Sequence, residues 1–381
     1  MKPKTIQQTA SRTRHLCLLV ACLLGIAPQG FAAGVDVVLD RLENPWAISF
    51  LGDGRMLVSE KRGRLRILDA SGRLGRPLQG VPVVGSLQDG KVVVPEQGGL
   101  LDVVTDRSFA SNRTLYFCFS EEKNYRVSTA LARARLSDDE TRLEKVQVIF
   151  SQSPKMGSWN HFGCRIAQAP DGNLFLAMGD MLEKRELAQD LGTHIGKVVR
   201  VTPDGKPPAG NPFAGKAKTL PEIWSYGHKN IQAAAVSPQG DLWVAEHGPL
   251  GGDELNLIQP GRNYGWPVIT HGKEYDGRPI GKGLTQMEGM EQPVRSLNGP
   301  PSGMAFLRTD RYGARWTGSV LVSYLRGAVV RLELDGNRVT REQTVWEDRA
   351  ERVRDVREAP DGQIYLLTDH PTNGRLLRLR P

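Results

Sequence analysis

Short runs of alternating apolar and small residues recur along this chain, and each follows a turn signal. The runs are RMLVSE after Gly52-Asp53-Gly54, TLYFCFS after Asn112-Arg113, NLFLAMGD after Asp171-Gly172, DLWVAEHG after Gln239-Gly240, SVLVSY after Gly318, and QIYLLTD after Asp361-Gly362. Glycine adopts a positive φ in such turns without steric cost, and the alternation is typical of half-buried strands. No long apolar stripe at helical spacing competes with this pattern. The chain is therefore predicted to be all-β.

The spacing of the turn signals indicates how the strands are organised. Successive signals are about 43 to 79 residues apart, which suits blades joined by long loops. A propeller protects most of its strand edges by radial repetition. We predict a six-bladed β-propeller of four-stranded antiparallel blades over residues 33–381, with residues 35–40 (VDVVLD) completing the blade of the C-terminal strands. A two-sheet sandwich is the structural alternative.

The first 32 residues have the pattern of an export signal. Residues 1–15 are basic and polar, residues 16–27 form an apolar run of 12, and Gly30-Phe31-Ala32 offers small residues for cleavage. This apolar run is too short to span a bilayer. We predict a cleavable signal peptide over residues 1–32 and a periplasmic or secreted protein. Lipoprotein processing at Cys22, in the sequence LVAC, is the alternative.

Composition limits the possible function classes. The 381 residues are 39% hydrophobic and 24% charged, which is typical of a globular protein. Without the predicted signal, 46 basic residues face 42 acidic ones, and this net charge of +4 includes no cluster that would favour nucleic-acid binding. Only Cys118 and Cys164 follow the signal, so disulfides are not the main stabilising element. Their spacing does not decide whether they pair.

An ordered set of motifs carries a family resemblance over essentially the whole mature chain. The motifs are NPWA at 44–47 with FLGDGRMLVSEKRGRLRILD, QGGLLD at 97–102, HFGCR at 161–165, the run from Ile223 to Pro267, and RVRDVR at 352–357 with APDGQIYLLTD. The most specific parts are EHGPLGGDELN and NYGWP. Together they resemble the soluble glucose/sorbosone dehydrogenases, also called aldose sugar dehydrogenases. The resemblance implies a six-bladed propeller, the cofactor pyrroloquinoline quinone (PQQ), and oxidation of aldose sugars at the anomeric carbon to lactones.

The resemblance assigns the general base to His161. This residue would take the proton of the sugar's anomeric hydroxyl while hydride passes to the quinone. Imidazole suits the task because its ordinary pKa lies near neutrality. Asn160 is the neighbour expected to orient the ring. A purely structural histidine near a strand start is the alternative.

PQQ is a planar tricarboxylate with an ortho-quinone, so its site requires cations and amide donors. Arg352 and Arg354 are two residues apart, and on a strand both would face the same side and bind carboxylates. By resemblance, Gln97 and Asn230 donate hydrogen bonds to PQQ, and Gln232 contributes. The alternatives are a solvated basic strand end for the arginines and ordinary turn or cap bonds for the amides.

Calcium is the metal that the resemblance implies. The carbonyls of Gly248 and Pro249 would hold an ion that also binds PQQ and polarises its quinone as a Lewis acid. Glu254 and Tyr264 would hold a second, structural calcium, with Tyr264 using its carbonyl; oxygen ligands are those that calcium prefers. A tight turn capped by Asp253 is the alternative for GGDELN. The sequence contains no zinc, nucleotide-binding or α/β-hydrolase motif.

Lys229 departs from the family pattern. The usual GHRNPQG reads GHKNIQA at 227–233. The family arginine lies over the quinone, and lysine keeps its charge without its planar fork. Leu325 stands where some relatives place a lysine toward PQQ. Exposure of Lys229 to solvent is the alternative.

Two further function classes remain open on the same propeller. A calcium-dependent lactonase would gather Glu246, Asp253, Asn160 and Asn230 around one ion, and a sugar- or protein-binding propeller would have lost catalysis. No haem-attachment CxxCH motif occurs, so an oxidoreductase would pass its electrons to a separate acceptor. We expect an aldose substrate, an external electron acceptor, no nucleic acid, no membrane span, and a monomer or weak dimer.

Overall fold

Short strands joined by glycine-containing turns dominate the computed structural model, which describes residues 33–88, 91–94 and 96–381. The predicted signal peptide, Cys22 and the predicted domain boundary lie outside the described residues. Helical structure in the described part is limited to α1 (Phe109–Asn112) and the short 3-10 segments η1 (Arg185–Gln189) and η2 (Ala314–Trp316). None of the described helices is long and apolar enough to cross a membrane.

Six antiparallel sheets form the blades, and the strands of each blade are hydrogen-bonded in order. The first blade contains β2 (Pro45–Gly52), β3 (Arg55–Glu60) and β4 (Arg64–Leu68). The second contains β7 (Leu100–Thr105), β8 (Thr114–Lys123), β9 (Arg126–Leu136) and β10 (Leu143–Ser151). The third contains β11 (Gly163–Gln168), β12 (Leu174–Met178), β13 (Lys197–Val201) and β14 (Ile223–Tyr226).

The remaining three blades complete the ring. The fourth contains β15 (Ile231–Val236), β16 (Leu242–Glu246), β17 (Glu254–Ile258) and β18 (Arg295–Ser296). The fifth contains β19 (Pro301–Phe306), β20 (Val320–Tyr324), β21 (Ala328–Asp335) and β22 (Arg338–Glu347). The sixth contains β23 (Val353–Glu358), β24 (Ile364–Thr368), β25 (Gly374–Leu379) and β1 (Val35–Leu42). A separate hairpin pairs β5 (Ser86–Gln88) with β6 (Lys91–Val93).

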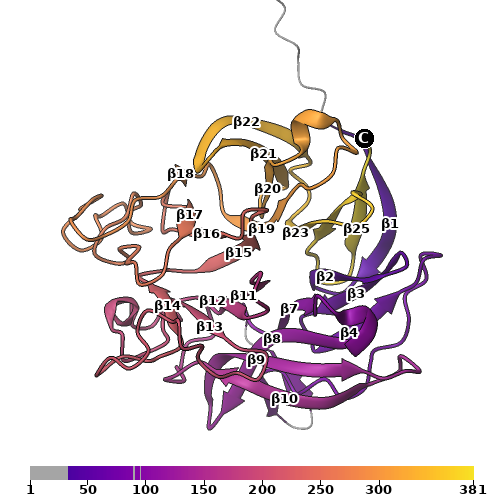
Figure 1. The fold of residues 1–381 in the computed structure, drawn as a ribbon, viewed down its shortest axis with the longest axis horizontal. Helices are drawn as coiled ribbons and strands as arrows, with labels where there is room; N and C mark the ends of the chain where they lie inside the picture. The colour runs from indigo at the N-terminus through magenta and orange to yellow at the C-terminus, as the bar shows by residue number, and fades with distance from the viewer. Residues whose placement is uncertain (1–32, 89–90, 95) are drawn as a thin grey trace, which may run out of the picture. The chain divides into compact units, whose positions relative to one another are not determined.

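The predicted six-bladed propeller is confirmed. The first strand of each blade contacts the first strand of the next, in the closed order β2, β7, β11, β15, β19, β23 and back to β2 (Figure 1). The predicted closure is also confirmed, because β1 pairs antiparallel with β25 and places Val35 opposite Leu379. The six runs predicted as strands become β3, β8, β12, β16, β20 and β24, the second strand of every blade. The first blade has three hydrogen-bonded strands where four were expected.

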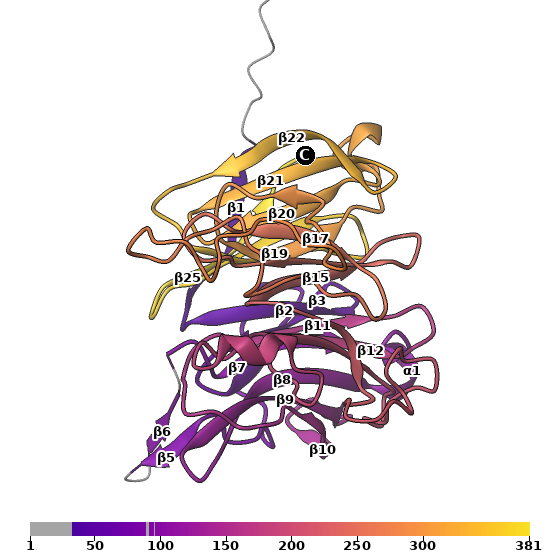
Figure 2. The ribbon, with the colours of Figure 1, turned by 90° about the vertical axis from the view of Figure 1, so that its left-hand side faces the viewer.

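The propeller has two faces that are defined by the direction of the first strands. We call the face where these strands begin the start face and the opposite one the end face. Figure 2 shows the β5–β6 hairpin, which precedes β7, and α1, which follows β7, at opposite ends of the second blade's strands. The turn signals of the sequence join the first and second strands of the blades, so they lie on the end face. The loops of the start face do not contain these turn signals, so their sequences can carry functional residues.

Arg165 of β11 joins all six first strands at the centre of the ring. Its guanidinium donates to the carbonyls of Gln232 at 2.6 Å and Arg354 at 3.0 Å, and to that of Ser302. It pairs with the carboxylates of Asp355 at 3.1 Å and Asp102 at 3.5 Å. It also lies 4.0 Å from the ring centroid of Trp46 in β2. These partners come from β2, β7, β15, β19 and β23, and the side chain is almost fully buried.

Replacing Arg165 by methionine should destabilise the propeller strongly. The substitution leaves Asp102 and Asp355 with less compensating charge in a buried site, a loss of about 3–5 kcal/mol for a broken buried pair. Thermal and urea unfolding would measure the change. Arg338→Met, which breaks an exposed pair with Asp335, is the matched control and should change stability little. Equal stability of the two variants would contradict a central role for Arg165.

Candidate functional site

The start face brings the sequence-predicted residues together. Gln97, His161 and Asn230 each come just before the first strand of a blade, and Arg352 and Arg354 lie at the beginning of another, β23. The loop after β16 carries the predicted calcium ligands Gly248 and Pro249 to the same face, because β16 runs antiparallel to β15, and Glu254 begins β17 directly after this loop. Residues that lie far apart in the sequence therefore surround one end of the central axis.

His161 is held as a buried imidazole with one ring nitrogen engaged. Its Nδ1 lies 2.7 Å from Oδ1 of Asp180, and only 8% of the residue is exposed. A carboxylate accepts hydrogen bonds, so Nδ1 is the donor in this pair and Nε2 is the ring nitrogen left for a substrate. Nε2 has no hydrogen-bond partner among the described residues. The arrangement is that of a base whose reactive nitrogen is free.

Asp180, and not Asn160, orients this ring. Asn160 was expected to do so, but its backbone bonds to Ser158 and its side chain makes no bond to His161 in the described structure. Asp180 receives further hydrogen bonds from Nε1 of Trp266 at 2.8 Å and from the Leu182 N–H at 2.9 Å. These two donors fix the carboxylate, and the carboxylate fixes the imidazole.

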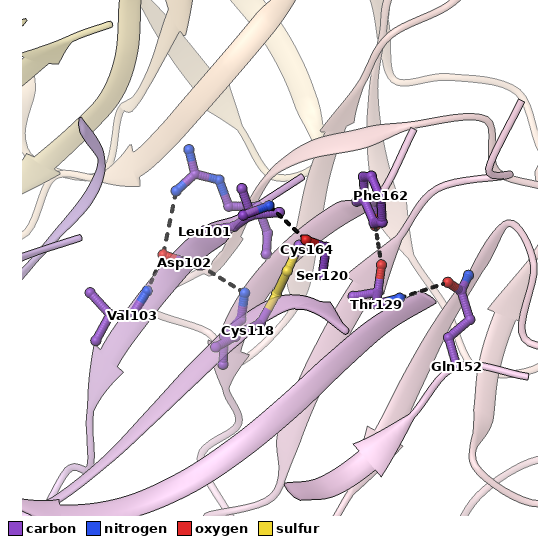
Figure 3. Close-up of a disulfide and its surroundings, with 12 residues drawn as sticks. Leu101, Asp102, Val103, Cys118, Ser120, Thr129, Gln152, Phe162 and Cys164 are labelled. Carbon is purple, nitrogen blue, oxygen red and sulfur yellow. Dashed lines mark hydrogen bonds and ion pairs between the residues drawn. A yellow bond between two sulfur atoms is a disulfide. The ribbon is translucent and has the colours of Figure 1, made fainter. Parts of the chain in front are cut away.

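The loop that carries His161 is anchored on both sides. His161 has a φ of 55° and Cys164 a φ of 79°, both in the left-handed region that few residues adopt. The hydroxyl of Thr129 donates to the Phe162 carbonyl at 2.8 Å, and Cys164 forms a disulfide with Cys118 of β8, with Cα atoms 5.9 Å apart (Figure 3). The spacing had left this pairing undecided. The second and third blades are thus joined covalently next to the base.

Close backbone packing at Gly179 also supports the loop. A Cβ atom at this position would lie 2.0 Å from the His161 carbonyl oxygen, so only glycine allows the approach. The Gln97 side chain adds a further contact, because its Oε1 accepts the His161 N–H at 3.0 Å. One predicted cofactor residue thereby positions the predicted base.

A cationic cavity of about 290 Å³ opens next to the loop of His161, and its lining includes Phe162 and Gly163 but not His161 itself. Its lining includes every predicted cofactor residue except Lys229, namely Gln97, Asn230, Gln232, Arg352 and Arg354, together with Lys61, His247, Leu325 and Asp369. Arg352 and Arg354 share one face, as predicted, because both donate to Oδ2 of Asp369, at 3.3 and 3.0 Å. Arg354 is buried, which excludes the solvated strand end for this residue, whereas the Arg352 side chain is 50% exposed.

Arg354 lines the cavity and begins a chain of polar contacts along its wall. Its Nη1 donates to Oε1 of Gln232 at 3.2 Å, and its Nε is buried with no partner among the described residues. Gln232 in turn donates through Nε2 to Oδ1 of Asn230 at 3.0 Å. The side chains from Arg354 to Asn230 therefore form a continuous polar wall of the cavity.

Lys229 is buried, which excludes the solvent-exposed alternative. Only 6% of the residue is exposed, and its Nζ lies 5.7 Å from the ring centroid of Trp266. Its backbone N–H donates to Oε2 of Glu246 at 2.7 Å. Burial lowers the pKa of the Lys229 ammonium, although Asp180 and Glu246 oppose the shift. Lys229 and His161 are joined through Asp180, whose N–H donates to the Lys229 carbonyl at 2.7 Å.

A second, atom-sized cavity lies next to Lys229. It measures about 10 Å³, and its lining includes Gly248, Glu254 and Tyr264, three of the predicted calcium ligands. Glu254 faces Glu246 as a directly paired residue of the neighbouring strand. Burial and the Glu246 charge raise the pKa of Glu254 to about 8. Two carboxylates so placed repel each other unless a proton or a cation lies with them.

The fourth predicted calcium ligand, Pro249, does not line this cavity. Its carbonyl accepts the Gly252 N–H at 3.3 Å. Asp253 caps the same turn, because its Oδ1 accepts the Gly248 N–H at 3.1 Å. This is the capped turn that was the alternative for GGDELN. A Cβ atom on Gly248 would lie 2.0 Å from the Gly252 backbone, so the turn requires glycine there.

Comparison with known proteins decides the family. The Glucose / Sorbosone dehydrogenase family profile matches residues 42–378. Aldose sugar dehydrogenase YliI of Escherichia coli is 40% identical over 373 residues, which is 96% of each chain. The chain belongs to the glucose/sorbosone dehydrogenase family. The sequence resemblance is thereby confirmed.

Solved structures of the family agree with the fold. The apo form of the soluble aldose sugar dehydrogenase from Escherichia coli superposes with a TM-score of 0.84 at 39% identity, covering 92% of this chain and 99% of that one. The PQQ-bound form of the aldose sugar dehydrogenase from Streptomyces coelicolor has a TM-score of 0.72 at 28% identity, covering 91% and 98%. The family likeness therefore extends through all six blades.

The cavity of this family member fits PQQ in charge and in donor type. The lining holds three cations, Lys61, Arg352 and Arg354, against the two acids Glu96 and Asp369. The buried, unpartnered Nε of Arg354 indicates a missing acceptor. The volume of about 290 Å³ lies near the lower end of the range for small-molecule sites. An anionic, planar ligand matches these properties.

An oxygen-ligated cation fits the smaller cavity. Glu246 and Glu254 line this cavity and supply negative charge, and Nδ2 of Asn256 donates to both carboxylates, at 3.1 and 3.4 Å. The described residues contain no cluster of three or more acidic, histidine or cysteine side chains that could hold a metal, so backbone carbonyls would have to complete the ligand set. Calcium accepts such mixed oxygen ligands.

The residues of the lactonase alternative are engaged separately. Glu246 accepts hydrogen bonds from Nδ1 of His228 at 2.9 Å and from the Lys229 N–H. Oδ1 of Asn230 is taken by Gln232, and Asp253 caps its own turn. The structure therefore gives no support to a single ion held by Glu246, Asp253, Asn160 and Asn230.

Five residues of the site were missed in the sequence, namely Asp180, Trp266, Lys61, His247 and Asp369. Asp180 and Asp369 are the last residues of two runs whose pattern predicts strands, and Trp266 is part of the NYGWP motif. The sequence pattern does not mark any of the three as a site residue. His247 donates through Nε2 to the Pro301 carbonyl at 2.7 Å and lines both cavities. Burial lowers the pKa of His247 to about 3, so it is neutral at working pH.

Proposed function

We propose that this chain oxidises aldose sugars at the anomeric carbon to lactones, with PQQ as the electron acceptor in the site and His161 as the general base. The observation that carries the proposal is the His161–Asp180 pair, 2.7 Å apart, with Phe162 and Gly163, the two residues that follow His161, in the wall of a cationic cavity. The PQQ-bound relative from Streptomyces coelicolor supports the choice of cofactor.

The proton has a defined destination in this scheme. Nε2 of His161 takes the proton of the anomeric hydroxyl as the bond between that carbon and its hydrogen breaks. The imidazolium that forms is stabilised by Asp180, whose charge is itself held by Trp266 and Leu182. Bound PQQ supplies the two-electron acceptor that takes the hydride.

The remaining residues would bind and orient the cofactor. Arg352 and Arg354 would bind its carboxylates, and Gln97, Asn230 and Gln232 would donate hydrogen bonds to it. Lys229 would place its charge beside the quinone. The carbonyls of Gly248 and Pro249 would hold a calcium ion shared with PQQ, and Glu254 and Tyr264 a structural calcium. The Pro249 carbonyl already accepts the Gly252 N–H, and its second lone pair would serve the ion.

Reconstitution tests the proposed function. Purified apoprotein is given PQQ and calcium, and reduction of a dye by glucose and other aldoses is followed. We expect sugar-dependent dye reduction that requires PQQ. Lactone hydrolysis without PQQ would favour the lactonase instead, and sugar or protein binding with neither activity would favour a non-catalytic propeller.

Calcium removal should unfold the protein at a lower temperature as well as inactivate it. A ligand that binds only the native state adds about 2.7 kcal/mol at a free concentration of about 100 times its Kd. The melting temperature is measured before and after chelation, with calcium removal verified. Glu254→Gln is the matched control and should lose most of the response to chelator. An unchanged melting temperature of the wild type would contradict a structural calcium at Glu254.

The biological setting is part of the same proposal. Residues 1–32 would serve as a cleavable export signal and residues 33–381 as the catalytic propeller in the periplasm or outside the cell. The electrons would leave to an external acceptor, and the protein would act as a monomer or weak dimer. Detection of a mature N-terminus near residue 33 in exported material would test the first point.

A further inference from the structure

Lys61 places a cation in the large cavity from the first blade. It lies in the turn between β3 and β4, and its Nζ donates to the Glu96 carbonyl at 2.7 Å. Its backbone is fixed, because its N–H donates to the Asn44 carbonyl at 3.0 Å and its carbonyl accepts the Leu100 N–H at 2.9 Å. The ammonium is thus held at the cavity before any ligand binds.

This ammonium forms no close ion pair among the described residues, although the charges of Asp369 and Glu96 act on it from farther away. It forms no ion pair with a carboxylate, and the Glu96 carbonyl is its single hydrogen-bond acceptor in the described structure. The nearby carboxylate of Asp369 is already taken by Arg352 and Arg354, and by Nδ2 of Asn44 at 3.4 Å. An ammonium has three donors, so two remain for a ligand. A half-buried ammonium with two unused donors is stabilised when an anion binds beside it.

The cations of the cavity are distributed unevenly around the sixth blade. Arg352 and Arg354 belong to that blade, Lys61 lies on the first blade at one side, and Leu325 of the fifth blade lies on the other side. The flank formed by Leu325 is apolar. Charge for a ligand with several carboxylates therefore comes from the arginines and from the flank of Lys61.

We propose that Lys61 binds a carboxylate of PQQ and is the third cation of the cofactor site, next to Arg352 and Arg354. This inference rests on the proposed function, because it takes PQQ to be the occupant of the cavity. Lys61 acts on cofactor affinity and not on proton transfer, since His161 lies on the third blade. A smaller anion with one carboxylate would be satisfied by the arginines alone, so the third cation favours a polycarboxylate.

Equilibrium titration of apoprotein with PQQ in the presence of calcium tests the inference. We expect Lys61→Met to weaken PQQ binding about tenfold to a hundredfold, as for the loss of a hydrogen bond between charged groups, and Lys61→Arg to stay within about threefold of the wild type. Lys206→Met, at an exposed turn of the end face, should bind as the wild type does. The wild-type Kd should also rise more steeply with salt than that of Lys61→Met.

The outcomes separate this inference from the proposed function. If the wild type binds PQQ and Lys61→Met binds it equally well, the role of Lys61 is wrong and the function stands. If the wild type does not bind PQQ, both are wrong. A merely structural role would lower the melting temperature of the apoprotein and would not be rescued by arginine, and that result would also overturn the inference.

Discussion

Replacing His161 by alanine is expected to lower kcat about 10²–10⁴-fold or more while largely sparing PQQ binding. The variant removes the base whose Nε2 is free in the structure, and a positioned base contributes about this much to the rate. Rates are measured with saturating PQQ, calcium and sugar, and the Kd for PQQ is measured separately. A kcat near that of the wild type would show that another group takes the proton.

Asp180→Asn tests the same assignment without removing the ring. The amide loses the charge that stabilises the imidazolium, and it can turn its NH₂ group toward Nδ1 and force the proton onto Nε2. We expect kcat to fall by about 10²-fold or more, with a smaller change in melting temperature than for Arg165→Met. His271→Ala, at an exposed loop position, is the control and should leave kcat unchanged. Normal turnover of Asp180→Asn would contradict the pairing of Asp180 with the base.

The fold was predictable because the second strands of the blades follow plain local rules. Runs such as RMLVSE and QIYLLTD come after glycine turns and have neighbours on both sides in their sheets, so their pattern is regular. The first strands of the blades do not follow these local rules. β7 and β23 include Asp102, Arg354 and Asp355, polar residues whose partners include the central Arg165 of another blade. Local patterns contain no signal for such long-range compensation.

The site was predictable only where the family motifs name residues. Those motifs led to His161 and to most of the cavity lining, whereas Asp180 required the strand register. Gly163 of β11 is paired with Met178 of β12, so residues two positions beyond that pair, His161 and Asp180, come to lie opposite each other. Lys61 and Trp266 reach the site through blade packing, which the sequence pattern does not encode.

Lys229→Ala is expected to lower activity about tenfold or more. Its ammonium is buried beside Trp266, and Lys229 lines the smaller cavity, which shares His247 with the larger cavity that would hold PQQ. A fixed charge in a water-poor site stabilises developing negative charge more strongly than it would in water, and loss of one such group costs about 10²–10³-fold in comparable sites. The measurement is kcat and PQQ affinity of reconstituted enzyme, with Lys206→Ala as the control. Unchanged values of both quantities would show that Lys229 does not touch the cofactor.

Lys229→Arg should raise kcat or PQQ affinity and should change the pH profile in a defined direction. Burial lowers the pKa of the Lys229 ammonium, so its charge is present at low pH and is lost as the pH rises through that pKa. Activity that depends on this charge therefore falls on the alkaline side. Arginine does not deprotonate in proteins, so the variant should keep its activity to higher pH. An alkaline limit that is identical in the wild type and Lys229→Arg would mean that a different group sets it, and the charge of Lys229 would then have no part in the reaction.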